Sequence, residues 1–367
     1  MTTVVDTPTT VFRAPTDTTA PAPAGARGVP RDGVRLMAVR PNGIAHLQFS
    51  DLPGQLRAGD LVVVNNSATV AAEADGELVG VGPVVVHAAA PLDDGNWVIE
   101  IRSAPDAARA ILDASAGDRI RLGPTQTLTL TLTAPYPQSD SSPTGTGNRL
   151  WRSTIDGDLG RHLRRHGRPI AYGYLNRRYP LRDYQTVFGT SAGSAEMPSA
   201  GRPFTHRLVT RLISSGIGIA PITLHTGVSS QEAGEAPQPE RFEVPAATAR
   251  LVNATRDSGG RIVAVGTTVT RALESAVTDA GRVEPRRGWT ERVISPSDPA
   301  RVVTGLITGW HDPHASHLLL VESVAGPELT QSAYDAAVAT GYLWHEFGDS
   351  ALLLPPVAIG PWRSTTY

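Results

Sequence analysis

The chain has 367 residues, 40% of them hydrophobic and only 5% aromatic, and its formal net charge is −2. All 33 cationic side chains are arginine, and the sequence contains neither lysine nor cysteine. Without lysine, a Schiff-base enzyme, a Walker-A NTPase and a protein kinase are excluded. Without cysteine, disulfides, thiolate metal sites and cysteine nucleophiles are excluded. The length predicts two domains with aliphatic cores.

The sequence has no membrane or export signal. No segment approaches the roughly 18 apolar residues of a membrane span, and the start, MTTVVDTPTTVFRAP, lacks the regions of a signal peptide. We therefore expect a cytoplasmic protein with no membrane association. Residues 1–30 are rich in Thr, Pro and Ala and are predicted to form an extended or disordered lead-in.

The first half of the remaining chain is rich in predicted strands. Residues 61–64 form an apolar run between Gly-Asp and Asn-Asn, which predicts a buried strand. An Asp-Asp-Gly turn between residues 84–86 and 97–101 predicts a hairpin. Residues 127–133 alternate Thr and Leu, as a half-buried strand does. A helix is predicted at 105–114, within what is otherwise the composition of a small β-barrel.

The second half alternates strands and helices. Helices are predicted at 205–215, 245–256, 268–279 and 331–340, and strands at 219–224, 261–265, 305–308 and 318–321. This alternation predicts an α/β domain with a largely parallel or mixed, barrel-like sheet. We expect that domain to comprise residues 31–68 and 156–367, with a small β-barrel domain inserted at 69–155.

Two short patterns suggest alternative chemistries. Residues 189–193 match the G-x-S-x-G nucleophile elbow, but no helix is predicted directly after them, as the elbow requires. His311, His314 and His317 have a spacing that three zinc ligands could adopt, although Pro313 favours a loop. We favour a single functional His311, with the other two histidines exposed, and expect no metal.

One stretch is strongly basic and contains interleaved tyrosines. Guanidinium groups bind phosphate in bidentate fashion, and tyrosine rings stack on unpaired bases. The stretch is therefore a candidate for binding RNA, or else a solvated helix face followed by a structural loop. The candidate nucleic-acid contacts are Arg161, Arg164, Arg165, Arg168, Arg177, Arg178 and Arg182.

The junction at residues 263–268 is the strongest local indication of a binding site. A predicted strand ends at Gly266, where backbone can approach a ligand closely, and a predicted helix follows. The hydroxyls of Thr267 and Thr268 and the free N–H groups of the helix start would suit a carboxylate. The alternative is ordinary capping of the helix by one of these threonines.

These residues carry a family resemblance. Residues 261–276, RIVAVGTTVTRALESA, closely resemble the signature of the S-adenosylmethionine:tRNA ribosyltransferase-isomerases of queuosine biosynthesis. Other segments resemble family motifs in the same order, over residues 31–353. They are GDLVVVNN at 59–66, DYQTVF at 183–188, PSAG at 198–201, TLHTG at 223–227, LITGWH at 306–311 and FGD at 347–349.

The resemblance implies a fold and a reaction. The family fold is an α/β domain with an inserted β-barrel. Its members transfer the ribosyl part of S-adenosylmethionine to 7-aminomethyl-7-deazaguanine in tRNA and isomerise it, giving epoxyqueuosine and releasing adenine and methionine. S-adenosylmethionine is consumed as a cosubstrate, no metal is required, and the partner is the anticodon stem-loop of tRNA; no protein partner is implied.

Site residues follow from the matched motifs. The resemblance implies acid–base roles for His225 and His311, and a role for Glu240 as base or as holder of the substrate amine. It implies that Thr267, Thr268 and Arg271 hold the methionine carboxylate. It also implies that Glu274 orients Arg271 and that Asp349 binds ribose hydroxyls. The full set of expected cosubstrate contacts is Gly266, Thr267, Thr268, Arg271, Glu274, Ser199, Gly201 and Asp349.

The sequence also departs from the family pattern. Ala68 and Glu73 occupy positions of family arginines, Pro203 replaces a histidine, and residues 228–237 replace a segment rich in glycine and phenylalanine. These differences leave two alternatives open. The chain could be a divergent paralogue that cleaves or rearranges S-adenosylmethionine with an acceptor other than tRNA, or a catalytically inactive protein that binds RNA or nucleosides.

Overall fold

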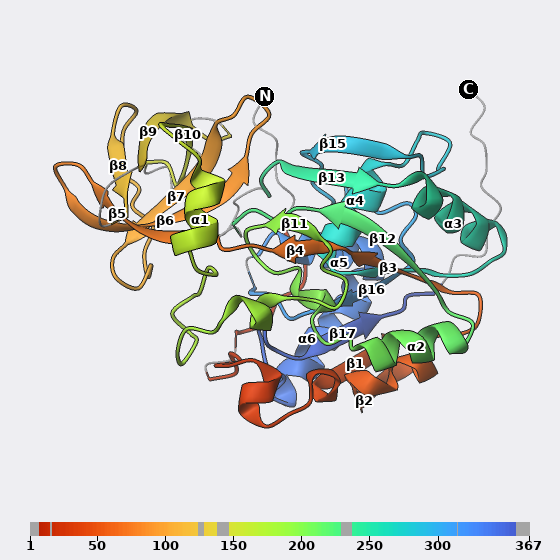
Figure 1. Cartoon of the computed structure of the whole chain (residues 1–367). Coiled ribbons are helices and arrows are strands. Elements are labelled where there is room, and N and C mark those ends of the chain that lie inside the picture. The colour runs from red at the N-terminus through yellow and green to blue at the C-terminus, as the bar shows by residue number, and fades with distance from the viewer. Residues whose placement is uncertain are drawn as a thin grey trace.

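The computed structural model describes residues 7–14, 17–123, 128–137, 147–228, 237–313 and 315–356. A closed β-barrel lies beside a larger layered α/β part (Figure 1). The large sheet has nine strands in the order β15-β13-β12-β3-β14-β16-β17-β1-β2, and parallel and antiparallel pairs both occur in it. The expected fold class, a mixed-sheet α/β domain with an inserted β-barrel, is confirmed.

The strands of the large sheet come from both ends of the chain. Its amino-terminal members are β1 (Arg35–Arg40), β2 (Gly43–Gln48) and β3 (Leu61–Asn65). The others are β12 (Gly218–Leu224), β13 (Glu240–Val244), β14 (Ile262–Val265), β15 (Arg286–Thr290), β16 (Gly305–Thr308) and β17 (Ser350–Leu353). The central strand β3 is buried along its whole length because both faces of the sheet are covered.

Two apolar clusters cover the two faces. One contains Val63 with buried side chains of α3 (Ala246–Asp257), α4 (Thr267–Ser275), α5 (His317–Ala325) and α6 (Pro327–Ala339). The other contains Val62 and packs against α2 (His206–Ser214) and a 3₁₀ segment, Phe49–Gln55. Adjacent residues of β3 therefore belong to different cores, as the alternation of a strand requires.

The barrel is closed by six antiparallel strands in the order β10-β7-β6-β5-β8-β9. They are β5 (Glu73–Leu78), β6 (Gly82–Pro91), β7 (Trp97–Ser103), β8 (Arg119–Leu122), β9 (Leu128–Pro135) and β10 (Leu150–Ile155). The predicted hairpin is the β6–β7 pair. In β9, Leu128, Leu130 and Leu132 point into the core, so the predicted alternation is confirmed for the described part of that strand. Helix α1 (Leu159–His166) packs against the barrel.

Two predicted elements are wrong. Residues 318–321 were expected to form a strand but belong to helix α5, in which nearly every side chain is buried. A helix that is apolar all round shows no 3.6-residue period, so a short apolar run cannot be distinguished from a buried strand. The helix expected at 105–114 is a turn, because the Arg102 side chain hydrogen-bonds the carbonyls of Ala107 (2.5 Å) and Ala108 (3.3 Å) and draws the chain back.

The described part of the expected lead-in is packed rather than disordered. Ala20, Ala22 and Ala24 are buried, and a 3₁₀ turn spans Ala24–Arg27. The Thr10 N–H and hydroxyl both donate to the buried carboxylate of Glu322 on α5, each at 2.6 Å. Composition did not predict this, because the partner of Thr10 is more than 300 residues away.

In the part of the chain that the structure describes, no helix is long and apolar enough to cross a membrane.

Candidate active site

A cavity of about 560 Å³ lies at the carboxyl edge of the parallel strands β12, β14 and β16. The residues that follow these strands, Thr226, Gly266 and Gly309, all line it. Ligands of open α/β sheets bind at this edge, and the volume suits a small-molecule site. Of the expected site residues, those on the lining are Ser199, Glu240, Gly266, Thr267, Thr268, Arg271 and His311.

The start of α4 forms one wall. Gly266 has φ +93°, a conformation that favours glycine, and it is the N-cap of α4 with no side-chain cap. Capping by Thr267 or Thr268, the alternative considered from the sequence, therefore does not occur. The first N–H groups of α4 and these two threonines remain on the cavity wall, as an anion site at a helix start requires.

Arg271 is held by the protein around it. Its guanidinium donates to Glu240 Oε2 at 2.6 Å and to three carbonyls, those of Gln238, Thr290 and Arg292, at 2.7 to 3.0 Å. Four of its five N–H donors thus have protein acceptors. Arg271 lines the cavity, but most of its hydrogen-bonding capacity fixes the wall.

Glu240 completes this ion pair. Its Oε1 accepts from the Gly227 N–H at 3.3 Å, and burial raises its pKa above the ordinary value even though Arg271 opposes the shift. Because its charge is matched by Arg271, Glu240 is poorly suited to the expected role of holding a substrate amine.

Two expected contacts have other roles. Glu274 does not orient Arg271: its carboxylate accepts the backbone N–H groups of residues 301–303 at 2.8 to 2.9 Å. Asp349 is buried and accepts from the backbone and side chain of Arg35 and from the Leu343 N–H. Neither residue lines the cavity, nor does Gly201, which packs near Thr186. These three positions match family motifs, but in this structure the residues contact other parts of the chain instead of the cavity.

Two histidines face the cavity together. The rings of His311 and His317 are stacked, with centroids 4.7 Å apart and planes 3° apart. His311 Nε2 is 2.9 Å from Thr308 Oγ1. Burial lowers the pKa of His311 well below its ordinary value and that of His317 to about 4. Both imidazoles are therefore neutral near pH 7 and able to accept a proton.

The predictions for His317 and His314 have different outcomes. His317 is half-buried on the cavity wall, so the expectation that it is exposed is wrong. His314 lies outside the described residues. Within the ranges that are described, no group of three or more His, Asp or Glu side chains is placed to hold a metal ion.

His225 is not part of the cavity lining, although the next residue, Thr226, is. Its Nδ1 is 2.7 Å from the Ser67 hydroxyl, which is 2.6 Å from the Ser194 hydroxyl. These serines belong to a small parallel pair, β4 (Ser67–Thr69) and β11 (Ser191–Ser194). A Cβ at Gly193 would lie 2.5 Å from His225 Nδ1, so the glycine allows the ring to pack there. Ser191 lies in β11 and no helix begins directly after it, which removes the nucleophile-elbow interpretation.

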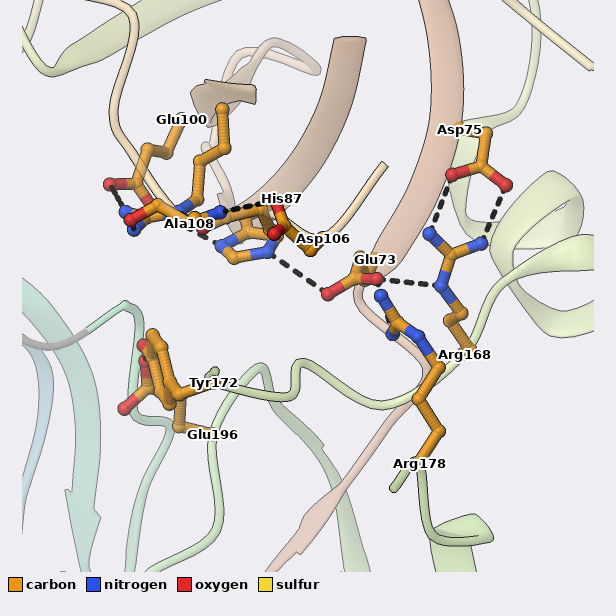
Figure 2. A network of polar contacts seen from close by, with 12 residues as sticks. Glu73, Asp75, His87, Glu100, Asp106, Ala108, Arg168, Tyr172, Arg178 and Glu196 are labelled. Carbon is orange, nitrogen blue, oxygen red and sulfur yellow. Dashed lines mark hydrogen bonds and ion pairs between the residues drawn. The ribbon is translucent and has the colours of Figure 1, made fainter. Parts of the chain in front are cut away.

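Another part of the cavity lining was not predicted. It carries two carboxylates, Glu196 and Glu346, with Tyr172, Tyr174 and His345. The Tyr172 hydroxyl donates to Glu196 Oε1, and the Tyr174 ring stacks on both Tyr172 and His345. Figure 2 shows the first of these pairs, Tyr172 beside Glu196. Glu196 and Glu346 lie 150 residues apart, each beside a recognisable motif. The position of each glutamate next to a family motif is the one sequence signal that could have identified Glu196 and Glu346.

Part of the basic stretch is bound to carboxylates of the barrel. Arg168 makes a bidentate pair with Asp75 (2.7 and 2.5 Å), and Arg168 and Arg178 both reach Glu73 at 2.6 Å (Figure 2). These two arginines are therefore not free phosphate ligands as expected. The other five are exposed, and Arg161 has a loose pair with Asp158 (3.8 Å).

Glu73 also starts a buried chain of charges on the outer face of the barrel strands, because their alternate neighbours Ala74, Val86 and Ile99 point into the barrel core. His87 contacts Glu73 through Nε2 and Glu100 through Nδ1, each at 3.1 Å. Glu100 is in turn bound by Arg102 at 2.7 Å and Arg149 at 2.9 Å. Burial acts to raise the pKa of both glutamates, but their cationic partners outweigh it and hold both values at about 2.

Fold and site together define a two-part α/β protein whose cavity is lined by the uncapped start of a helix, by neutral imidazoles and by two glutamates. The sequence profile of the family described as "Queuosine biosynthesis protein" matches residues 9–353. The chain belongs to this family.

Relatives and a solved structure agree with the assignment. An S-adenosylmethionine:tRNA ribosyltransferase-isomerase of Symbiobacterium thermophilum is 35% identical over 338 residues, which is 89% of this chain and 94% of the relative. The protein of that name from Acidiphilium cryptum is 33% identical, over 88% and 93% of the two chains. The crystal structure of S-adenosylmethionine tRNA ribosyltransferase from Thermotoga maritima is 25% identical with a TM-score of 0.51, and the match covers 94% of this chain and 99% of that one.

Proposed function

We propose that this chain transfers and isomerises the ribosyl group of S-adenosylmethionine onto 7-aminomethyl-7-deazaguanine in tRNA, releasing adenine and methionine. Family membership supports the reaction. The observation that carries it furthest is that the start of α4 and the stacked pair His311–His317 face one cavity. An anion site and neutral proton acceptors are what this cosubstrate and this chemistry require.

The methionyl carboxylate binds at the start of α4, to the N–H groups after Gly266 and the hydroxyls of Thr267 and Thr268. Ser199 lies on the same lining. Arg271 contributes its one remaining N–H donor and keeps this wall in place through Glu240. The contribution of Arg271 to binding is therefore mainly through positioning.

His311 takes the proton from the carbon beside the sulfonium, which the positive sulfur acidifies. Thr308 fixes the ring by contacting Nε2, and burial keeps the imidazole neutral by lowering its pKa. His317 stacks on this ring and is a second neutral imidazole that can accept a proton in the cavity. His225 precedes the lining residue Thr226 and is held by the Ser67 hydroxyl.

The tRNA anticodon stem-loop approaches along the exposed arginines of the basic stretch. Arg164 and Arg165 on α1 and Arg177 and Arg182 beyond it form no ion pair within the described ranges. Guanidinium groups without an ion pair are available to bind phosphate, and an affinity for tRNA that rests on them falls as the salt concentration rises. We propose a cytoplasmic protein, since tRNA modification is a reaction of that compartment, and a reaction without a metal, so EDTA should not change the rate.

The experiment is to incubate the protein with S-adenosylmethionine alone and with tRNA carrying the deazaguanine precursor, and to measure adenine and methionine by mass spectrometry. The proposal predicts release of both only with the tRNA. Release without tRNA would instead establish an acceptor other than tRNA. Binding without release in either tube would establish an inactive binding protein.

A further inference from the structure

Three aromatic rings form a stack on the cavity lining. The centroid of the Tyr174 ring lies 6.0 Å from that of Tyr172 and 4.8 Å from that of His345, with the planes inclined by 24° and 15°. Among the described residues, Tyr172 and His345 make no ring contact with each other, so Tyr174 is the middle ring. All three residues line the cavity, and each is partly exposed.

The two ends of this stack differ. At one end Tyr172 meets the barrel, because the His87 ring stands at 87° to it with the centroids 6.5 Å apart. At the other end, within the described part of the chain, the His345 ring contacts no ring except Tyr174. Aromatic faces on a ligand cavity are surfaces on which a further planar ring can stack. The stack is therefore supported at Tyr172 and open at His345.

The backbone holds His345 in a costly conformation. Its φ is +66°, which is uncommon for residues other than glycine. The chain is fixed on both sides of it: the Trp344 N–H donates to the Thr18 carbonyl at 2.8 Å, and Arg202 donates to the Glu346 carbonyl at 3.2 Å. Such strain persists only where the surrounding structure imposes it, and it is concentrated at ligand sites. It is a second and independent reason to assign a ligand to the His345 ring.

The position of the stack indicates which ring would join it. Both tyrosines lie on the segment that joins α1 to Arg177 and Arg182, where the tRNA is proposed to approach. Proteins recognise unpaired RNA bases by stacking them on aromatic side chains. His345 also contributes to the low pKa of His311, so the open end of the stack lies near the proposed proton acceptor. These observations favour the base at which the reaction takes place.

Resting on the proposed function, we propose that the free face of His345 is the stacking subsite for the acceptor base. The 7-deazaguanine ring continues the stack beyond His345, with Tyr174 behind it and Tyr172 bracing the stack against the barrel. Burial lowers the pKa of His345, so its imidazole is neutral at pH 7 and a base can cover it without desolvating a charge. No bond forms or breaks in this step.

The test measures what the base itself contributes to binding. Two anticodon stem-loop RNAs are compared, one with 7-aminomethyl-7-deazaguanine at the acceptor position and one with an abasic site there. Affinities are measured by calorimetry for wild type, His345→Asn, Tyr174→Leu and Tyr174→Phe. Asparagine tolerates a positive φ while removing the ring, leucine keeps bulk without a ring, and phenylalanine keeps the ring. The matched control is His206→Asn, at an exposed histidine of α2 away from the cavity lining.

Wild type, His206→Asn and Tyr174→Phe should bind the RNA with the base at least about tenfold more tightly than the abasic RNA. His345→Asn and Tyr174→Leu should each lose about tenfold of that preference. Their affinity for S-adenosylmethionine should stay unchanged, which also shows that the cavity is intact in both variants.

The contrary outcomes separate the subsite from the reaction. A fall in affinity for S-adenosylmethionine with an unchanged preference for the base would assign the stack to adenine and overturn the subsite. An active wild type whose preference survives in both ring-removing variants would overturn the subsite alone. Loss of the preference in both variants, with a wild type that releases no adenine, would leave the subsite standing and overturn the proposed function.

Discussion

Each part of the molecule contains a pair of shielded glutamates, and the two pairs differ in how their charge is matched. In the barrel, Glu73 and Glu100 are bridged by His87 and bound by four arginines, and both pKa values are held at about 2. In the cavity, Glu196 and Glu346 face one another's charge, and the pKa of Glu346 rises to about 8. Buried carboxylates bound by several cations stabilise the fold, whereas a carboxyl with a raised pKa on a cavity lining is a candidate for contact with a ligand.

The largest effect on stability is expected from removing the charge of Glu100, one of the two glutamates of the barrel strands. Glu100→Gln leaves His87, Arg102 and Arg149 without their shared carboxylate. We expect the free energy of unfolding to fall by about 3–5 kcal/mol in urea titrations. The matched control is Asp75→Asn at the exposed end of the same network, which should cost about 1 kcal/mol or less. Equal losses in the two variants would contradict the claim that burial sets the importance of these charges.

Replacing Glu346 should raise the free energy of unfolding rather than lower it. Glu346 binds its proton more tightly in the folded state than in the unfolded chain, so its presence makes stability fall as pH rises from about 4.5 to about 8. Glu346→Gln removes that fall and should stabilise the protein by on the order of 2 kcal/mol at pH 8, with little gain at pH 5. Chemical denaturation at the two pH values measures this. A destabilised variant at pH 8 would show that the cavity carboxyl is matched after all.

The loss of stability at low pH should depend on Glu73 and Glu100. The pKa values of Glu73 and Glu100 are depressed to about 2, so their contribution is complete above about pH 4.5 and is lost as pH falls toward 2. In Glu100→Gln the free energy of unfolding should fall less steeply with decreasing pH than in wild type. If the slopes of unfolding free energy against pH were identical between pH 2 and 4.5, the matched network would not be the origin of acid sensitivity.

The smallest effect concerns the exposed arginines. Arg164→Ala with Arg165→Ala should lower the slope of log affinity against log salt for tRNA by about 1 to 2, without changing S-adenosylmethionine binding. Arg250→Ala, an exposed arginine on α3, is the control. Salt titrations with an unchanged slope would remove the tRNA from this face.

Much of the fold was predictable because local patterns determine it. The run that forms β3, the turn between β6 and β7 and the alternation of β9 each carry their own signal. Helix α5 was mistaken for a strand because burial on all sides erased its period. The turn after β7 depends on the side chain of Arg102, which no local pattern records.

The site was predictable only in part. The Gly-Thr-Thr start of α4 and His311, both singled out from the sequence, line the cavity, and a glycine at a strand end and a histidine in a matched motif are local features. The Glu196–Glu346 pairing, the stacking of His317 on His311 and the capture of Arg168 by Glu73 and Asp75 depend on long-range contacts. Composition and spacing do not determine such contacts.

The most direct test of the central claim is to measure adenine and methionine after incubating the protein with S-adenosylmethionine and tRNA that carries 7-aminomethyl-7-deazaguanine. The account predicts that both products appear with this tRNA and that neither appears when the tRNA is left out. Binding of S-adenosylmethionine and tRNA with no release of adenine would contradict it.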